Sequence, residues 1–416
     1  MILKSEIFDK LQFLFETYKI NDHNLHCIIN FNGNINKIIL KKTIMMMFDV
    51  APILSCKYVE DSKDPYWETV EISSSEDVLT FVKTQSEFNS FMTSKINEAT
   101  DPQMKACLLT SDDDCLGILM NHMVCDGAGL KKYVYSLCNL YSHLLKDPDY
   151  QPQNILNGDR SLNIINKQFR LKDKLKALVF QNEESNGSTN LKFPMSTEGE
   201  VEPFIVTHEV PEDRFLSIKN YCKNHQVTIN DVALAAFYRV LYKISGKQDL
   251  SISVAVDMRK HLKDKDTNAL SNLTAMVISN LSYEPNDTLD DTVKKVHQDM
   301  NLKKENIIGL NTFVKISLLF KLFNYKQIKK LFEKKFENPL IGMTNVGVLD
   351  SEKLYFEGTQ IRNALMFGSI KYRPYFQVAL TTYNNIMTFT INLYGNSNDK
   401  ENIENFLLLL DQELPG

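Results

Sequence analysis

The sequence predicts a mixed α/β fold made of two similar lobes, and three observations support this prediction. Short apolar runs typical of buried strands alternate with amphipathic helical stretches along the chain of 416 residues. Residues 181–200 are rich in Asn, Ser, Gly, Glu and Thr and poor in apolar groups, which marks a boundary. The stretches on the two sides of this boundary contain similar elements. We therefore expect an N-terminal lobe at 1–180, a linker at 181–202 and a C-terminal lobe at 203–416.

The composition is that of a globular chain that can bury a sizeable core. Hydrophobic residues make up 43% of the chain and charged residues 24%. The formal net charge of −5 is small for this length and gives no reason to expect nucleic acid as a partner. No segment reaches the ~18 apolar residues of a membrane-spanning helix. The first residues carry acids where a signal peptide would be apolar, which predicts a cytoplasmic protein.

The seven cysteines include no C-x-x-C pair, and most of them lie among apolar neighbours. This pattern predicts buried reduced thiols rather than a disulfide framework or a zinc site.

Local patterns in the N-terminal part predict strands bounded by turn residues and helices with one apolar face. The acidic stretch from Ser111 to Asp114 joins two apolar runs, and this spacing predicts a β-hairpin with a four-residue loop. The expected elements are a strand at 25–32, a helix at 35–48 stopped by Pro52, strands at 53–59 and 66–72, a helix at 78–96, a hairpin at 104–123 that turns at 111–114, and a helix at 130–145.

The C-terminal part predicts a second unit with the same kinds of element. Thr228 or Asn230 can cap one helix at its start, and Gly246 can end it. The expected elements are a strand at 203–210, helices at 212–223 and 228–246, strands at 250–257 and 274–283, helices at 289–301 and 313–336, a strand at 339–349, a hairpin within 371–395 that turns at Asn384 and Asn385, and a helix at 401–410.

The expected helix at 313–336 holds seven lysines against one acid, Glu333, and has an apolar face. A basic amphipathic helix of this kind can lie on an anionic membrane. It can equally be a surface helix that packs its apolar face on the second lobe. Both alternatives remain open, and weak membrane contact through 313–336 is one expectation.

The stretch CLGILMNHMVCDGAGL, from Cys115 to Leu130, sets a histidine at the end of a buried strand. His122 follows the apolar run, and an Asp-Gly pair comes four residues later. We expect Gly127 and Gly129 to close the strand with a turn, because positive φ costs glycine little.

Three interpretations of His122 are open. As a structural residue, it would hydrogen-bond a backbone carbonyl in the core. As a metal ligand, it would act with Cys125 and Asp126, but a turn at Gly127 splays these side chains and no second His or Cys cluster is near, so we expect no metal. As a general base, its neutral imidazole would take a proton from a hydroxyl or amine that attacks a carbonyl.

The segment NHMVCDGAG resembles the HHxxxDG motif of the chloramphenicol acetyltransferase-like superfamily. This superfamily includes condensation domains of nonribosomal peptide synthetases, alcohol acetyltransferases and wax-ester-type acyltransferases. Further segments resemble the family in the family's order across most of the chain, namely the helix and strand at 33–58, VTINDVALAAFYRVLY, DMRKHL, and TNVG at 344–347.

The resemblance implies two chloramphenicol acetyltransferase-like lobes, each a mixed β-sheet packed with helices, that form a V around a central tunnel. It implies that the acyl donor and the acceptor enter from opposite faces. The co-substrate would be acyl-CoA or a phosphopantetheinyl carrier, with no bound cofactor, and the acceptor an alcohol or, less commonly, an amine. An acyl carrier protein is then a candidate partner.

Among the motif residues, the resemblance implies that only His122 is the catalytic base, because Asn121 stands where many members have the first histidine. Asp126 matches the motif aspartate, which holds the loop through an ion pair with an arginine. Arg259 in DMRKHL is the expected partner, and Gly127 would keep the turn tight.

Thr344 and Asn345, in the loop that ends with Gly347, are candidates for stabilising a tetrahedral oxyanion. Cys125 lies at a variable position of the motif, which disfavours a covalent nucleophile. The expected function is therefore transfer of an acyl group from acyl-CoA to an alcohol by His general-base catalysis. A condensation-type enzyme that uses carrier-bound donors to form an amide or ester is the first alternative. A non-catalytic relative that binds acyl-carrier partners is the second.

Overall fold

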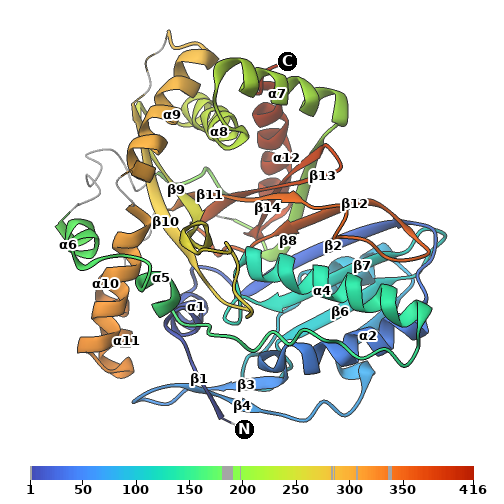
Figure 1. Cartoon of the computed structure of the whole chain (residues 1–416). Coiled ribbons are helices and arrows are strands. Elements are labelled where there is room, and N and C mark those ends of the chain that lie inside the picture. Colours follow the sequence, from blue (N-terminus) through green and yellow to red (C-terminus); the bar gives the residue numbers. More distant parts are fainter. Residues whose placement is uncertain are drawn as a thin grey trace.

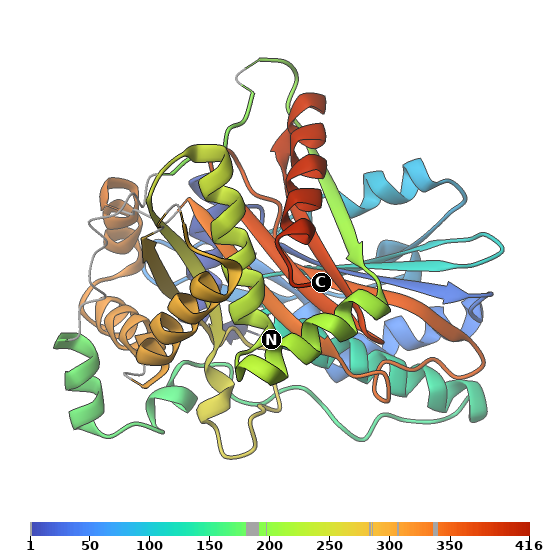
Figure 2. The same ribbon diagram turned by 90° about the horizontal axis from the view of Figure 1, so that it is seen from above.

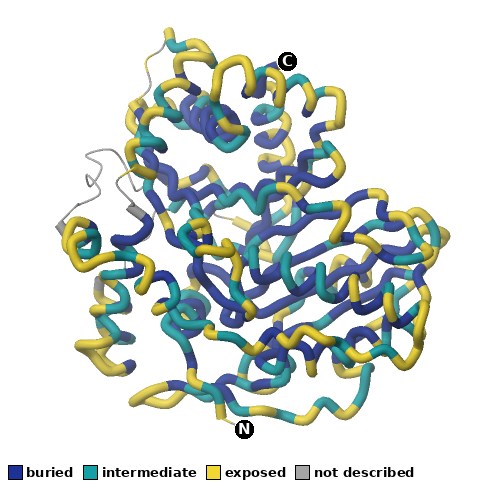
Figure 3. Tube along the Cα trace, in the orientation of Figure 1, coloured by how far each residue is buried: buried dark blue, intermediate teal, exposed yellow. Residues whose placement is uncertain are grey.

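The computed structural model describes residues 2–179, 191–196, 198–282, 284, 286–305, 308–335 and 340–416. Two large sheets and one small sheet are packed with helices (Figure 1), which confirms the predicted α/β class. Burial follows the sheets, while the outer faces of the helices are exposed (Figure 3). No helix in these ranges is long and apolar enough to cross a membrane.

The five-stranded sheet carries the histidine stretch. Its strands, in spatial order, are β12 (Gln360–Phe367), β2 (Asn24–Asn32), β7 (Cys115–Asn121), β6 (Met104–Leu109) and β5 (Leu79–Val82). Helices α2 (Lys37–Val50) and α4 (Gly127–Lys146) pack on one face, and α3 (Gln85–Met92) packs on the other. Every residue of β7 is therefore buried, as in a strand covered on both faces.

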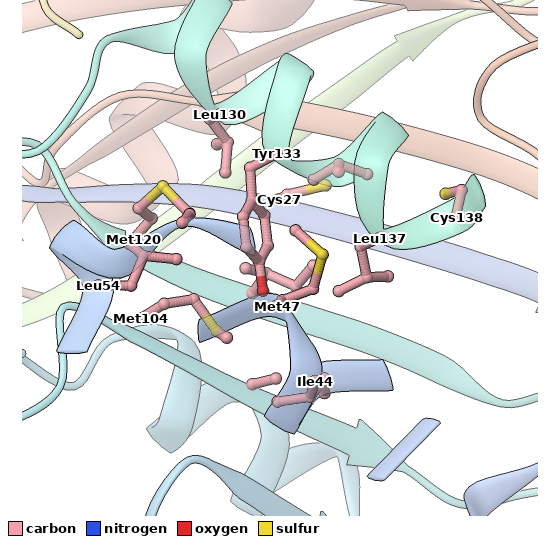
Figure 4. Close-up of a cluster of buried hydrophobic side chains, with 14 of the residues drawn as sticks. Cys27, Ile44, Met47, Leu54, Met104, Met120, Leu130, Tyr133, Leu137 and Cys138 are labelled. Carbon is pink, nitrogen blue, oxygen red and sulfur yellow. The ribbon is translucent and has the colours of Figure 1, made fainter. Parts of the chain in front are cut away.

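One cluster of apolar side chains joins α2, α4 and this sheet (Figure 4). Burying each large side chain stabilises the fold by roughly 1.5–3 kcal/mol, so the cluster holds β7 firmly against α4. Its members, each at most 1% exposed, include Ile44, Met47, Met104, Met120, Leu130, Tyr133 and Leu137.

The six-stranded sheet forms the second half of the core. Its strands, in spatial order, are β10 (Thr274–Ser282), β9 (Asp249–Asp257), β11 (Ile341–Leu349), β13 (Phe376–Tyr383), β14 (Ile386–Gly395) and β8 (Glu202–Val210). Figure 2 shows helices gathered on one side of it, and these are α7 (Glu212–His225), α8 (Ile229–Ser245), α9 (Leu289–Glu305) and α12 (Ser397–Gln412). Thr228 caps α8 and Gly246 ends it at φ +65°, as predicted.

Strand β12 belongs to the C-terminal part of the sequence but lies in the five-stranded sheet, whose other strands come from the N-terminal part. It pairs with β2 in the five-stranded sheet, and its Leu365 and Phe367 pack on Ala379 of β13. The sheets are thus not divided cleanly at the predicted linker, and the predicted lobe boundaries stay a prediction. Residues 181–190 and 197 of that linker lie outside the described residues.

A third group of elements flanks the two large sheets. Aromatic contacts join its helices, with Phe8 packed edge-on against Phe313 at 5.6 Å and Tyr18 stacked on Phe332 at 5.4 Å between ring centroids. The group comprises the sheet of β1 (Ile2–Lys4), β4 (Tyr66–Thr69) and β3 (Cys56–Val59) and the helices α1 (Ile7–Thr17), α10 (Ile308–Leu322) and α11 (Tyr325–Lys335). Short helices α5 (Asn163–Asn166) and α6 (Leu171–Val179) precede the second half.

Two predictions in the N-terminal part are wrong. The helix expected at 78–96 is strand β5 followed by α3, because residues 79–82 pair in parallel with β6 and Thr84 begins the helix with a capping box to Glu87. The strand expected at 53–59 begins only at Cys56, after a 3₁₀ turn at Pro52–Ser55.

The single long helix expected at 313–336 is also wrong. The chain breaks between α10 and α11, where the side chains of Asn324 and Gln327 each accept a hydrogen bond from the other residue's backbone N–H at 3.0 Å. This reciprocal pair is a capping box that starts a new helix. Residue 336 lies outside the described residues, and neither α1 nor β12 was expected.

Candidate active site

His122 is the first residue after β7, and the neighbouring Asn121 fixes the end of that strand. The amide of Asn121 donates to the side-chain oxygen of Gln103 at 2.6 Å and accepts from the backbone N–H of Met123 at 2.8 Å. Asn121 is fully buried in these contacts. It therefore holds the turn and does not line the cavity beside His122.

The His122 ring is oriented by two hydrogen-bond acceptors. Its Nδ1 lies 2.9 Å from the Cys125 carbonyl oxygen and 3.2 Å from Oδ1 of Asn272. The Asn272 amide nitrogen donates to the carbonyls of His122 at 2.8 Å and Met123 at 3.2 Å, which fixes which end of the amide faces the ring. Nδ1 must therefore carry the proton, and Nε2 holds the free lone pair.

The surroundings of His122 favour the neutral imidazole. Desolvation lowers the pKa of His122 below its ordinary 6.5, and the nearby charge of Lys371 lowers it further. The charge of Asp126 and the hydrogen bond to the Cys125 carbonyl act in the opposite direction without reversing the shift. At neutral pH the ring is consequently a base with Nε2 ready to accept a proton.

Asp126 is buried and forms four polar contacts. Its Oδ2 accepts from Arg259 Nη1 at 2.9 Å, from Leu273 N at 2.7 Å and from Thr274 Oγ1 at 2.9 Å, and its Oδ1 accepts from Gly129 N at 3.0 Å. Burial would raise the pKa of Asp126, but the Arg259 guanidinium outweighs burial and holds it below the usual value. The predicted ion pair with Arg259 is present, and Asp126 is also the N-cap of α4.

Arg259 extends this network away from the cavity. It donates to the Ser271 carbonyl at 2.7 Å and to Asp257 Oδ1 at 3.1 Å. Ser271 immediately precedes Asn272, the residue that orients His122. Arg259 and Asp126 therefore hold the segment 271–273, and this segment carries the Asn272 side chain that orients His122.

The predicted role of the two motif glycines is wrong. Neither Gly127 nor Gly129 has positive φ, and both lie in the first turn of α4. A Cβ on Gly129 would lie 2.5 Å from Cβ of Cys125, so glycine is required there for packing. A Cβ on Gly127 would meet only Val346 at 3.9 Å, so Gly127 does not keep the turn tight but leaves space in the cavity wall.

The thiol of Cys125 is not placed for nucleophilic chemistry. Cys125 is fully buried, its Sγ lies 3.1 Å from Sδ of Met120, and burial raises the pKa of the thiol well above its usual value. Within the described residues no group of three or more His, Cys, Asp or Glu side chains could hold a metal ion.

A cavity of about 620 Å³ lies beside His122, with walls from both large sheets and from the helices α1, α10 and α11. Its apolar wall includes Phe8, Leu11, Phe15, Ile316, Leu319, Ile328, Leu331 and Phe332. Its polar groups include Gln12, Asn21, Ser253, Thr344, Ser369, Lys371 and Gln377. A largely apolar cavity with a few polar groups near a base is the usual form of a small-molecule site.

The segment from Thr344 to Gly347, expected as a loop, lies within strand β11 and reaches the cavity only in part. Thr344 lines the wall and remains a candidate oxyanion donor. Asn345 instead bonds Gly347 N at 2.8 Å and Asn230 at 3.5 Å, and neither Asn345 nor Gly347 is among the described residues of the wall. Gly347 takes φ +81° at a bulge in β11, where the pairing with β13 shifts register.

Sequence reasoning missed three residues whose contacts shape the candidate site. Asn272 orients His122, and Lys371 places a cation in the cavity wall. Arg160 donates to both oxygens of Asp9 at 3.1 and 3.0 Å and to the Val124 carbonyl at 3.1 Å, which ties α1 to the histidine turn. All three act across long sequence separations, and no local pattern marks them.

Two helix-packed sheets with a histidine at the cavity between them are the arrangement expected of the chloramphenicol acetyltransferase-like class, in agreement with the resemblance. Within this class, the chain belongs to the condensation domain family, whose model matches residues 18–407.

Solved structures agree with this assignment. The first condensation domain of the CDA synthetase superposes with a TM-score of 0.71 at 14% identity, covering 99% of this chain and 95% of that one. The trichothecene 15-O-acetyltransferase of Fusarium sporotrichioides superposes with a TM-score of 0.69 at 13% identity and the same coverage. At these identities the likeness establishes the fold.

Two curated proteins match part of the chain. Cyclosporin synthetase of Tolypocladium inflatum is 24% identical over 180 residues, which is 40% of this chain. A nonribosomal peptide synthetase of Curvularia clavata is 22% identical over 219 residues, which is 49% of this chain. The matched regions make up only 1% and 2% of those two proteins.

Proposed function

We propose that this protein transfers an acyl group from a thioester to an alcohol, with His122 as the general base. The observation that carries the proposal is which nitrogen of the His122 ring is protonated. Nδ1 faces two acceptors, so the lone pair is on Nε2, and the ring lines a cavity of about 620 Å³. Nε2 has no partner among the described residues, which leaves it available to a substrate.

The proposed reaction proceeds in two steps. Nε2 takes the proton of the acceptor hydroxyl as its oxygen bonds to the thioester carbonyl carbon, and a tetrahedral oxyanion forms. The Thr344 hydroxyl is the candidate donor to that oxyanion. The carbon–sulfur bond then breaks, and the leaving thiolate recovers the proton from the imidazolium. No acyl-enzyme is formed, in keeping with the buried Cys125 thiol.

The apolar wall supports an acyl group with a hydrocarbon chain. Phe8, Phe15 and Phe332 lie in this wall, and each methylene placed against it would contribute about 0.8 kcal/mol. Acyl-CoA is the proposed donor. The same α10–α11 region leaves Leu322 and Phe323 exposed, and its contact with an anionic membrane remains a prediction.

A carrier-bound donor is the second candidate, and family membership supports it. The CDA domain and both curated relatives come from synthetases, one of them a nonribosomal peptide synthetase, so a phosphopantetheinyl carrier would fit the same chemistry and yield an amide or ester. A non-catalytic carrier-binding relative is the third candidate. The free Nε2 of His122 argues against it.

The proposal is tested by thiol release from a panel of acyl-CoA donors with alcohol acceptors and no carrier protein. We expect turnover by the wild type and a loss on the order of 10²–10⁴-fold in His122→Ala. The control is His143→Ala, which changes an exposed histidine of α4. Turnover only after a loaded carrier is added would favour the second candidate. Full activity of His122→Ala would contradict the role of the base.

A further inference from the structure

Lys371 is a cation in the cavity wall that forms no ion pair with the residues that the structure describes. It lies in the short connection between β12 and β13, and its side chain is half-buried. Its ammonium has no hydrogen bond or ion pair to any described residue. Desolvation lowers the pKa of Lys371 to about 8, and the charge of Asp22 opposes that shift only in part. A desolvated cation of this kind is costly unless a ligand pairs with it.

The backbone around Lys371 is held in place by the segment at 20–22. Residues Asn21 and Lys371 pair across an isolated antiparallel bridge. On its two sides, Asp22 N donates to the Ile370 carbonyl at 2.9 Å, and Tyr372 N donates to the Ile20 carbonyl at 3.2 Å. The ammonium is thus presented from a fixed backbone, which reduces the entropic cost of binding a ligand.

Two further polar groups in the same wall lack partners. The side-chain oxygens of Asn21, 6% exposed, and Ser369, 1% exposed, have no hydrogen bond within the part of the chain that the structure describes. Both residues line the cavity, as does Lys371. An unsatisfied buried polar group costs about 1–3 kcal/mol, so the Ser369 hydroxyl calls for an acceptor on a ligand, whereas the Asn21 oxygen calls for a donor.

Asp22, whose charge acts on Lys371, does not supply the missing charge. Oδ1 of Asp22 accepts from the backbone N–H of Asn24 and of Ile370, and none of its contacts is to Lys371. Burial raises the pKa of Asp22 to about 7, so it is only partly charged at neutral pH. Besides Lys371, the titratable groups of the wall are His122, which is neutral, Asp126, which is paired with Arg259, and Tyr375, whose pKa is raised by burial.

We infer that Lys371 and Ser369 form a binding site for a carboxylate, and that a substrate of this protein carries a free carboxylate in addition to its reacting group. A carboxylate offers the charge that the ammonium lacks and an acceptor for the hydroxyl of Ser369. The inference rests on the proposed acyl transfer at His122, because the carboxylate-bearing molecule shares the cavity with that base.

The carboxylate can come from the acceptor or from the acyl group, and binding experiments separate the two. Calorimetry would compare lactate, mandelate and serine with their methyl esters, and succinyl-CoA with butyryl-CoA. We expect the acid form to bind at least about tenfold more tightly in one of these panels, the effect of one ion pair of about 1.4 kcal/mol. The panel that shows this preference identifies the substrate that carries the carboxylate.

Variants link the preference to the proposed site. Lys371→Met should abolish the difference between acid and neutral ligand, and Ser369→Ala, which keeps the charge, should reduce it. The control Lys400→Met removes an exposed lysine of α12 and should leave the preference intact. Circular dichroism of each variant would establish that it is folded.

Failure of this inference is distinct from failure of the proposed function. Equal binding of acids and neutral ligands by the wild type in both panels would overturn the carboxylate site, even if thiol release depends on His122. A preference that survives in folded Lys371→Met would also overturn it. Carboxylate binding that requires Lys371, without any thiol release, would support the site and contradict the acyl transfer.

Discussion

Arg259 and Lys371 are two cations near His122 with opposite surroundings. Arg259 is bonded to Asp126, Asp257 and Ser271, and it lies outside the cavity wall. Lys371 lies in the wall and has no such partners among the described residues. A buried cation whose bonds are all made within the protein stabilises one arrangement of the chain, whereas one left unpaired beside a cavity is available to a ligand. The contrast distinguishes the framework of this site, which is held by the pair of Arg259 and Asp126, from its binding surface, which is the cavity wall at Lys371.

Breaking the paired cation should have the largest effect on stability. Arg259→Met leaves Asp126 buried and uncompensated, and we expect the free energy of unfolding to fall by about 3–5 kcal/mol. Chemical denaturation would measure this loss, with Lys260→Met on the next residue as the control. A loss below about 1 kcal/mol would show that the pair is not part of the framework.

The framework should also affect catalysis through Asn272. Asn272→Leu removes the acceptor that orients His122, and we expect kcat to fall about tenfold to hundredfold with little change in KM. The control is Asn268→Leu, which changes an exposed residue of the same connection. An unchanged kcat would show that the Cys125 carbonyl alone orients the ring.

Removing the unpaired cation, Lys371, should have the smallest effect, and it should increase stability where the loss of Arg259 decreases it. The pKa of Lys371 in the folded protein, about 8, lies below its ordinary 10.5, so its charge opposes folding. This cost is fully present below pH 8 and disappears as the pH rises towards 10.5. Lys371→Met should therefore raise the free energy of unfolding at pH 7 by about 1 kcal/mol. A clear destabilisation would show that Lys371 has a partner in the fold.

Much of the framework could be predicted from local sequence. The hairpin that carries the histidine, the cap at Thr228 and the turn at Asn384 and Asn385 depend on neighbouring residues, and each is present in the structure. The new helix starts at Thr84 and Asn324 could also have been predicted, because each of these capping residues has a glutamate or glutamine three residues later. The apolar periodicity of those segments favoured longer helices.

The binding surface could not be predicted in this way. Lys371 meets Asn21 across most of the chain, and Asn272 meets His122 across 150 positions. These contacts arise from the crossing of β12 into the other sheet and from the packing of the two sheets around the cavity, which no local pattern encodes. The Asp126–Arg259 pair was predicted only through the family resemblance.

The most direct test of the account is the pH profile of kcat/KM for thiol release, compared between the wild type and Lys371→Met. A neutral His122 with its pKa below 6.5 predicts that wild-type activity is constant at neutral pH and falls only below pH 6.5. Removing the Lys371 charge, which helps to lower that pKa, should move this acid limb to higher pH. An acid limb at the same pH in both proteins would contradict the claim that His122 acts as a base in a cavity shared with Lys371.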